Sequence, residues 1–354
     1  MEKTNFANGH GSSAFAQWTT KKPIIPAVVS GLAILGFFTA MLGSAQSQSS
    51  RRASRGSSDA AIEHFWTIFH GNAYAAIPTV QAQLQEAIER DPTNVTLQAL
   101  LGATHFWHAG EYTRDPNPNI AILQQDMPAA VQLFQNALNL DYGPHAAGYT
   151  YNDHLPGFLG ITTVHLGQMT GNTALISQGD QMLGYSVYQF PEFNNFNRWA
   201  AHNADPNTSS SYQAALDSLW QALDTCAATT VDRTNPDLKP YLPLQTPLGR
   251  KSACWPENAM APHSFEGFML NLGNGLVKAG QVDAAKIVYA NAQYASNYAT
   301  WPYRSVLESI AASDLNARAA LYNDNNPSND PPLAAPNRSC VYCHATVGEP
   351  GSNP

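Results

Sequence analysis

Residues 265–297 read FEGFMLNLGNGLVKAGQVDAAKIVYANAQYASN, and this stretch decides the fold. Apolar residues recur in it every three or four positions, as they do along one face of an α-helix. Ala285, Tyr289 and Ala292 show the spacing i, i+4 and i+7. Upstream of them, Gly273 is a small residue that lets two neighbouring helices approach each other closely. The stretch therefore predicts a pair of packed helices.

The same spacing of small and large apolar residues occurs twice more along the chain. The two further sets are Val80, Leu84 and Ala87, and Ala130, Phe134 and Ala137. Residues 59–323 show helical periodicity outside a proline-rich stretch at 227–262, and no credible run of alternating strands, so we expect an all-α fold. The spacing resembles the tetratricopeptide repeat, whose helix pairs stack into a solenoid. The resemblance implies an irregular solenoid of helical hairpins over residues 59–323, with long insertions such as residues 113–126.

A second pattern lies close to the C-terminus, where Cys340-Val341-Tyr342-Cys343-His344 precedes the last ten residues. Two thiols at this spacing reach the two vinyl groups of one porphyrin, and the next residue then lies against the ring face. The motif resembles that of c-type cytochromes. The resemblance implies one covalent haem c, anchored by Cys340 and Cys343, with His344 as the proximal iron ligand. The alternatives are a redox Cys-x-x-Cys pair and half of a zinc site, but the chain has no second Cys-x-x-Cys pair and the adjacent histidine fits neither.

The position of the motif leaves the second axial ligand to be found elsewhere. Residues 345–354 contain neither His nor Met, so the ligand must come from the helical body or from another chain. Histidine is favoured over methionine because the chain has 11 His and 7 Met, and this predicts bis-His ligation. The candidates, in order, are His263, His108 and His105. Because His108 falls on an apolar helix face, its alternative role is that of a hydrogen-bonded core residue.

The N-terminal region predicts export of the protein. Lys21 and Lys22 precede an apolar run over residues 23–43, which is about long enough to cross a bilayer. The small residues 43–45 fit a signal-peptidase site, so a cleaved signal and a membrane anchor both stay open. Residues 1–58 are thus a leader that ends in a Ser/Arg-rich linker. We therefore expect a periplasmic or outer-face location. This agrees with the predicted haem, because c-type haem is attached on the outer side of an energy-coupling membrane.

The two remaining cysteines predict a disulfide. Cys226 precedes a proline-rich loop over residues 227–262, and Cys254 lies within that loop. In an oxidising compartment an even pair of leftover cysteines is expected to be bonded, and the bond would pin the loop to the helix ending near Cys226. Residues 324–354 then form an Asn/Pro-rich tether followed by the haem-attachment segment.

The composition limits the classes of partner. The chain has 354 residues, of which 44% are hydrophobic and 12% charged, as in a globular protein. Six basic residues against Glu2 give residues 1–58 a net charge of +5, which leaves −13 for the rest of a chain whose total is −8. An acidic body disfavours nucleic acid and anionic lipid surfaces as partners, and favours docking to basic redox partner proteins.

Together, these patterns predict an exported mono-haem c-type cytochrome that acts in electron transfer, as a subunit of a membrane-associated or self-assembling complex. An electron carrier is favoured over a catalyst because the sequence shows no nucleophile elbow, phosphate loop or His-Glu-x-x-His zinc pattern. Two alternatives stay open. One is a tetratricopeptide-like scaffold with a structural or sensory haem, and the other is a haem enzyme with an open sixth coordination position.

Overall fold

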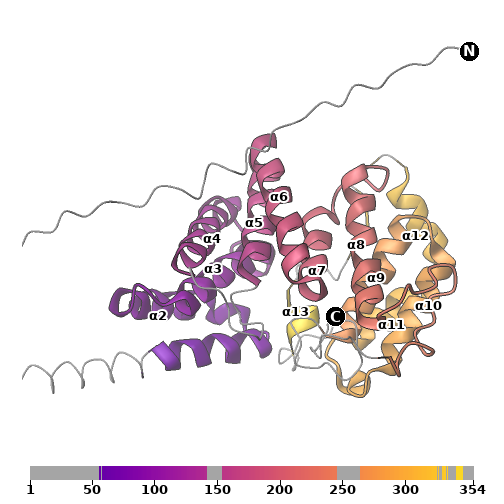
Figure 1. Cartoon of the computed structure of the whole chain (residues 1–354), viewed down its shortest axis with the longest axis horizontal. Coiled ribbons are helices and arrows are strands. Elements are labelled where there is room, and N and C mark those ends of the chain that lie inside the picture. The colour runs from indigo at the N-terminus through magenta and orange to yellow at the C-terminus, as the bar shows by residue number, and fades with distance from the viewer. Residues whose placement is uncertain are drawn as a thin grey trace, which may run out of the picture. The chain divides into compact units, whose positions relative to one another are not determined.

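Every regular element in the described part of the chain is helical, which confirms the predicted all-α class (Figure 1). The computed structural model describes residues 56, 58–141, 154–244, 264–324, 326, 329–331, 333 and 340–345. The first helix covers residues 58–70. The α-helices that follow are α2 (Ile77–Arg90), α3 (Val95–Gly110), α4 (Ile120–Leu140), α5 (Leu155–Thr170), α6 (Thr173–Gln189), α7 (Pro191–His202), α8 (Ser210–Ala227), α9 (Phe265–Lys278), α10 (Val282–Asn291), α11 (Arg304–Ala312), α12 (Leu315–Tyr322) and α13 (Val341–His344). The short 3-10 helices are η2 (Tyr74–Ala76), η3 (Tyr112–Arg114), η5 (Ala292–Tyr294) and η6 (Tyr298–Thr300).

Consecutive helices pack against each other in pairs: α3 against α4, α5 against α6, α7 against α8, and α9 against α10 (Figure 1). The close approach predicted at Gly273 is confirmed, because a Cβ atom there would lie 2.3 Å from the ring of Tyr289 in α10. Gly102 in α3 meets Phe134 in α4 in the same way, with 3.1 Å between the built Cβ and the ring. In both pairs a glycine on one helix therefore receives an aromatic ring from the next.

Side-chain caps fix where many of these helices begin. An Asn, Ser or Asp side chain accepts a hydrogen bond from the first turn, which satisfies a backbone N–H that has no partner within the helix. The capping residues are Asn94, Asn119, Asn172, Ser209, Ser264 and Asp314. The Ser264 cap sets the start of α9, which is one wall of the site described below.

The main hydrophobic core joins the two ends of the described chain. It includes Ala61 in the first helix, the buried faces of α2, α3 and α8 to α12, and Ala345 after α13. Val341 and Tyr342 are both 0% exposed within it. Two smaller clusters lie between α3, α4 and α5, and between α5, α6 and α7. The segment that carries the cysteine motif is therefore packed into the core.

Several predicted features lie outside the described residues: the apolar run 23–43, the residues 43–45, Cys254, His263 and much of the proline-rich loop. Cys226 is disulfide-bonded, and its predicted pairing with Cys254 stays a prediction. None of the helices described above has both the length and the apolar character that a membrane crossing requires.

A matched pair of glycine substitutions tests the helix packing. Gly273→Ala is expected to lower the free energy of unfolding by about 1–3 kcal/mol, because the new methyl group overpacks against Tyr289. Gly184→Ala, in an exposed position of α6 where a Cβ atom meets nothing within 4 Å, is expected to raise it by about 0.5–1 kcal/mol. Urea denaturation of both variants measures the two changes. If the two substitutions changed the free energy of unfolding in the same direction, the packing described here would be contradicted.

A buried histidine predicts how stability depends on pH. His202 is 4% exposed, and its two ring nitrogens lie 2.7 Å from Asp180 Oδ1 and 2.8 Å from Asp205 Oδ2. Burial alone would lower the pKa of His202, but the hydrogen bonds and charges of the two carboxylates reverse this effect and raise it. The folded state thus prefers the protonated imidazole. Its stabilisation is fully present below the unfolded pKa of about 6.5 and is lost as pH rises through the higher folded pKa.

We therefore expect the stability difference between the wild type and His202→Gln to shrink as pH is raised from about 5 to about 8. Denaturant titrations of both proteins across this range measure the difference at each pH. A difference that grows with pH would mean that the folded state holds His202 neutral.

Candidate functional site

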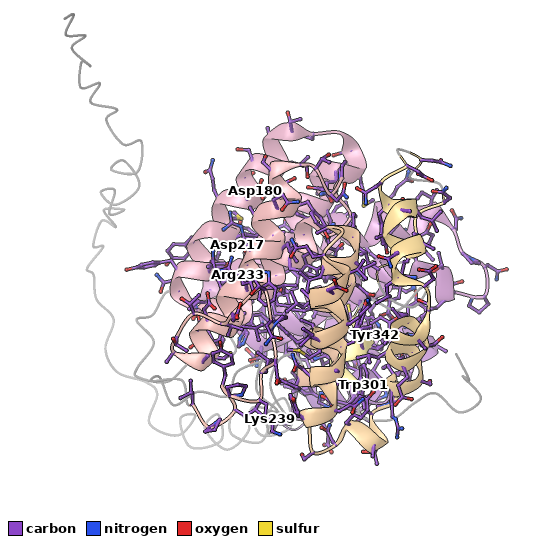
Figure 2. The ribbon with its side chains drawn as sticks, turned by 90° about the vertical axis from the view of Figure 1, so that its right-hand side faces the viewer. Asp180, Asp217, Arg233, Lys239, Trp301 and Tyr342 are labelled. Atoms are coloured by element: carbon purple, nitrogen blue, oxygen red, sulfur yellow. The ribbon has the colours of Figure 1, made fainter. Side chains whose placement is uncertain are left out.

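The motif helix α13 is held by contacts from distant parts of the chain. The backbone N–H of Cys340 donates to Glu111 Oε1 at 2.9 Å, just beyond the end of α3. The indole N–H of Trp301 donates to the carbonyl oxygen of Tyr342 at 3.1 Å, and Figure 2 labels both residues. The ring of Tyr303 meets that of Tyr342 edge to face, with 4.7 Å between centroids. The backbone of the motif is thus fixed on both sides of Val341.

The start of α9 packs directly against the second cysteine. The backbone N–H of Ser264 donates to the carbonyl oxygen of Cys343 at 3.2 Å. Gly267, in the first turn of α9, lies so close that a Cβ atom there would sit 2.5 Å from Cys343 Sγ. Only a residue without a side chain leaves room for the sulfur at this point.

Glu111 is the charged group that joins the motif to the helical body. Its side chain is 0% exposed and accepts hydrogen bonds from Trp107 Nε1 at 2.9 Å and from Arg114 Nη1 at 2.5 Å, in addition to the one from Cys340. The Arg114 side chain is itself only 8% exposed and lies over the ring of Tyr74. The carboxylate is therefore paired and multiply hydrogen-bonded, as a buried charge must be.

The imidazole of the motif lies against an aromatic ring of the first helix, which in turn packs on α3. The ring centroid of His344 is 4.8 Å from that of Phe69, and Phe69 in turn lies 5.0 Å from Trp107. Burial, with a smaller contribution from the charge of His70, lowers the pKa of His344 to about 3. The imidazole is therefore neutral at physiological pH, and neutral imidazole is the form that binds metal ions.

Of the two motif cysteines, Cys343 is buried and Cys340 is half-buried. Cys340 and Cys343 are not disulfide-bonded to each other. Burial raises the pKa of the Cys343 thiol, and the neighbouring Cys340 and Glu266 raise it further. A thiol with a raised pKa forms little thiolate at neutral pH, whereas redox dithiols and zinc ligands depend on the thiolate.

The residues present fit a covalently attached haem. Two adjacent thiols and a neutral imidazole come from α13 and its N-terminal flank, and the aromatic ring of Phe69 supplies an apolar wall. Beside Cys343, Glu266 is 1% exposed, and its Oε1 has no hydrogen-bond partner among the described residues. Burial raises the pKa of Glu266, so this carboxyl tends toward the protonated form and is able to donate a hydrogen bond to a bound group.

Two of the distal candidates share one carboxylate. His105 Nδ1 lies 2.7 Å from Asp126 Oδ1, and His108 Nδ1 lies 2.5 Å from Asp126 Oδ2. Burial alone would raise the pKa of Asp126, but the two imidazoles lower it. Both histidines are thus hydrogen-bonded residues, which is the alternative role given above for His108. The role of His105, His108 and His263 as distal ligands stays a prediction, and His263 lies outside the described residues.

The structure also gathers residues that the sequence did not single out. Phe69 and His70 from the first helix, Glu111 after α3, and Trp301 before α11 all lie at or near the motif. In the sequence, no local pattern distinguishes the aromatic residues at positions 65–66 and 301–303 from ordinary helix-packing residues. In the described ranges, no three His, Cys, Asp or Glu side chains are grouped as ligands of one metal ion.

Comparisons with known proteins leave the site to be interpreted from its chemistry. No protein-family model matches the chain, and neither does any curated protein or solved structure.

Proposed function

We propose that the protein is a mono-haem c-type cytochrome that acts in electron transfer. Cys340 and Cys343 are the thioether anchors, and His344 is the proximal iron ligand. The observation that carries the proposal is the order Cys-x-x-Cys-His in α13 and its flank. The burial of this short helix in the main core supports it, because a haem needs apolar surroundings that exclude water.

The residues around the motif suit a carrier because they hold it rigidly. When bound, a haem supplies a one-electron iron couple. Glu111 and Trp301 fix the backbone of α13, and Phe69 shields one side of the His344 ring. A rigid, water-poor site changes little between two oxidation states, and this favours outer-sphere transfer over bond-making chemistry.

The scaffold in this proposal is tetratricopeptide-like. Its support is the repeated arrangement of a glycine on one helix facing an aromatic ring on the next, at Gly102 with Phe134 and at Gly273 with Tyr289. Repeat scaffolds present extended surfaces, and the acidic body suits basic redox partner proteins. The proposed location is the periplasm or the outer face of the membrane, within a membrane-associated or self-assembling complex.

Mass spectrometry of the mature chain, made in a host that matures c-type cytochromes, tests the proposal. We expect a mass equal to the polypeptide plus one haem, and a haem that acid–acetone extraction does not remove. Cys340→Ala/Cys343→Ala is the matched control and should have the bare polypeptide mass. A wild-type chain at the bare polypeptide mass would refute the proposed function.

A further inference from the structure

The end of the first helix lies against the motif. Phe69, whose ring meets that of His344 at 4.8 Å, is followed directly by His70, the last residue of the helix. Trp66, one turn earlier, meets the His70 ring with 5.3 Å between centroids and 33° between ring planes. One face of this helix end therefore carries two aromatic rings and an imidazole, which is the set of groups that an apolar metal pocket requires.

The backbone after His70 is fixed in place. The chain turns at Gly71, and Asn72 takes the left-handed conformation with φ of 54°. Asn72 is 1% exposed, and its Nδ2 donates to the hydroxyl of Tyr303 at 2.8 Å. Its carbonyl oxygen accepts a hydrogen bond from Arg114 at 3.2 Å. An asparagine in this conformation ends the helix sharply, so the position of His70 is well defined.

The same two partners of Asn72 also hold the motif. Tyr303 packs against Tyr342, and Arg114 pairs with Glu111, which in turn accepts the N–H of Cys340. Two independent connections thus tie the end of the first helix to α13. The distance between the end of the first helix and α13 is therefore fixed by the protein itself and does not depend on a bound ligand. Such preorganisation is expected of a metal site.

The ring contacts agree with this arrangement. The centroid of the Phe69 ring lies 6.3 Å from that of His70, with 30° between the ring planes, and 4.8 Å from that of His344, with 36° between them. The Phe69 ring therefore meets both imidazoles.

From this geometry we infer that His70 is the second axial ligand of the haem iron, opposite His344. The inference rests on the proposed function, because it requires a haem at the motif. It keeps the predicted bis-His ligation and assigns the ligand to the first helix in place of His263, His108 or His105. Trp66 and Phe69 line the same side as His70 and keep water from the iron.

Three variants with the haem attached test the assignment: His70→Ala, His70→Met and the matched control His64→Ala, which changes a half-buried histidine of the same helix that is hydrogen-bonded to Gln83. We expect the wild type and the control to be low-spin and unresponsive to carbon monoxide. His70→Ala should lose the low-spin bands and bind carbon monoxide, and added imidazole should restore them. His70→Met should stay low-spin with a higher midpoint potential, as expected for His/Met ligation.

The outcomes separate this inference from the proposed function. Far-UV circular dichroism and the haem-bearing mass show first that each variant is folded and loaded. A wild type without covalent haem refutes the proposed function itself. If the haem is covalent but His70→Ala keeps the wild-type low-spin spectrum, or the wild type is already high-spin, the assignment of His70 is wrong. Loss of the low-spin bands on changing His263, His108 or His105, with none on changing His70, likewise overturns it.

Discussion

Glu111→Ala is expected to lower the free energy of unfolding by about 3–5 kcal/mol, which is the usual cost of leaving a buried charge without its partner. The variant removes the carboxylate that pairs with Arg114. Because the Arg114 side chain is only 8% exposed, water cannot solvate the guanidinium charge that is left without its partner. It also removes the acceptors of the Trp107 indole and the Cys340 backbone N–H. Urea denaturation measures the loss, and hydrogen exchange at α13 should become faster.

A second ion pair provides the control for this prediction. Glu308 pairs with Arg304 on the surface, where the two side chains are 45% and 46% exposed. Exposed pairs contribute about 0–1 kcal/mol, so Glu308→Ala should change the stability little. Glu111→Gln keeps one acceptor and the approximate shape, and is expected to fall between the two. Equal losses in Glu111→Ala and Glu308→Ala would contradict the description of Glu111 as a buried charge that holds the motif.

The helical class of the fold followed from local information. Periodic apolar residues determine a helix because each helical face repeats within a few positions, and the spacing of Ala285, Tyr289 and Ala292 carries that information within eight residues. The contact between Gly273 and the ring of Tyr289 was also predictable, since a short connection forces neighbouring helices to pack. This spacing does not determine how one helix pair packs against the next.

The candidate site could be predicted only in its Cys-x-x-Cys-His motif. The motif is local, so Cys340, Cys343 and His344 were identified from the sequence. Its supports are not local, since 229 residues separate Cys340 from its partner Glu111. The Asn/Pro-rich composition before the motif predicts an extended segment, but composition does not say where the end of that segment binds. The place where it binds is fixed by the burial of Val341 and Tyr342 in the main core. That core is formed by several helices that are distant in the sequence.

Tyr342→Ala is expected to lower the free energy of unfolding by about 3–5 kcal/mol, as for other buried aromatic residues that are cut back to alanine. The ring is 0% exposed and packs edge to face on Tyr303. Tyr188→Ala is the matched control, because Tyr188 is 83% exposed and should change stability by no more than about 0.5 kcal/mol. Urea denaturation compares the two. A similar small loss in both would mean that α13 does not pack in the core.

Combining Tyr342→Ala with Glu111→Ala tests whether the two residues act on the same segment. Each residue holds α13 from a different side, so once one contact is lost and α13 has moved away, the other has less to stabilise. The double variant should therefore lose less stability than the two single variants together, with a coupling energy of about 0.5–3 kcal/mol. Additive losses would indicate that Glu111 stabilises the end of α3 alone, and that its hydrogen bond to Cys340 contributes little to holding the motif.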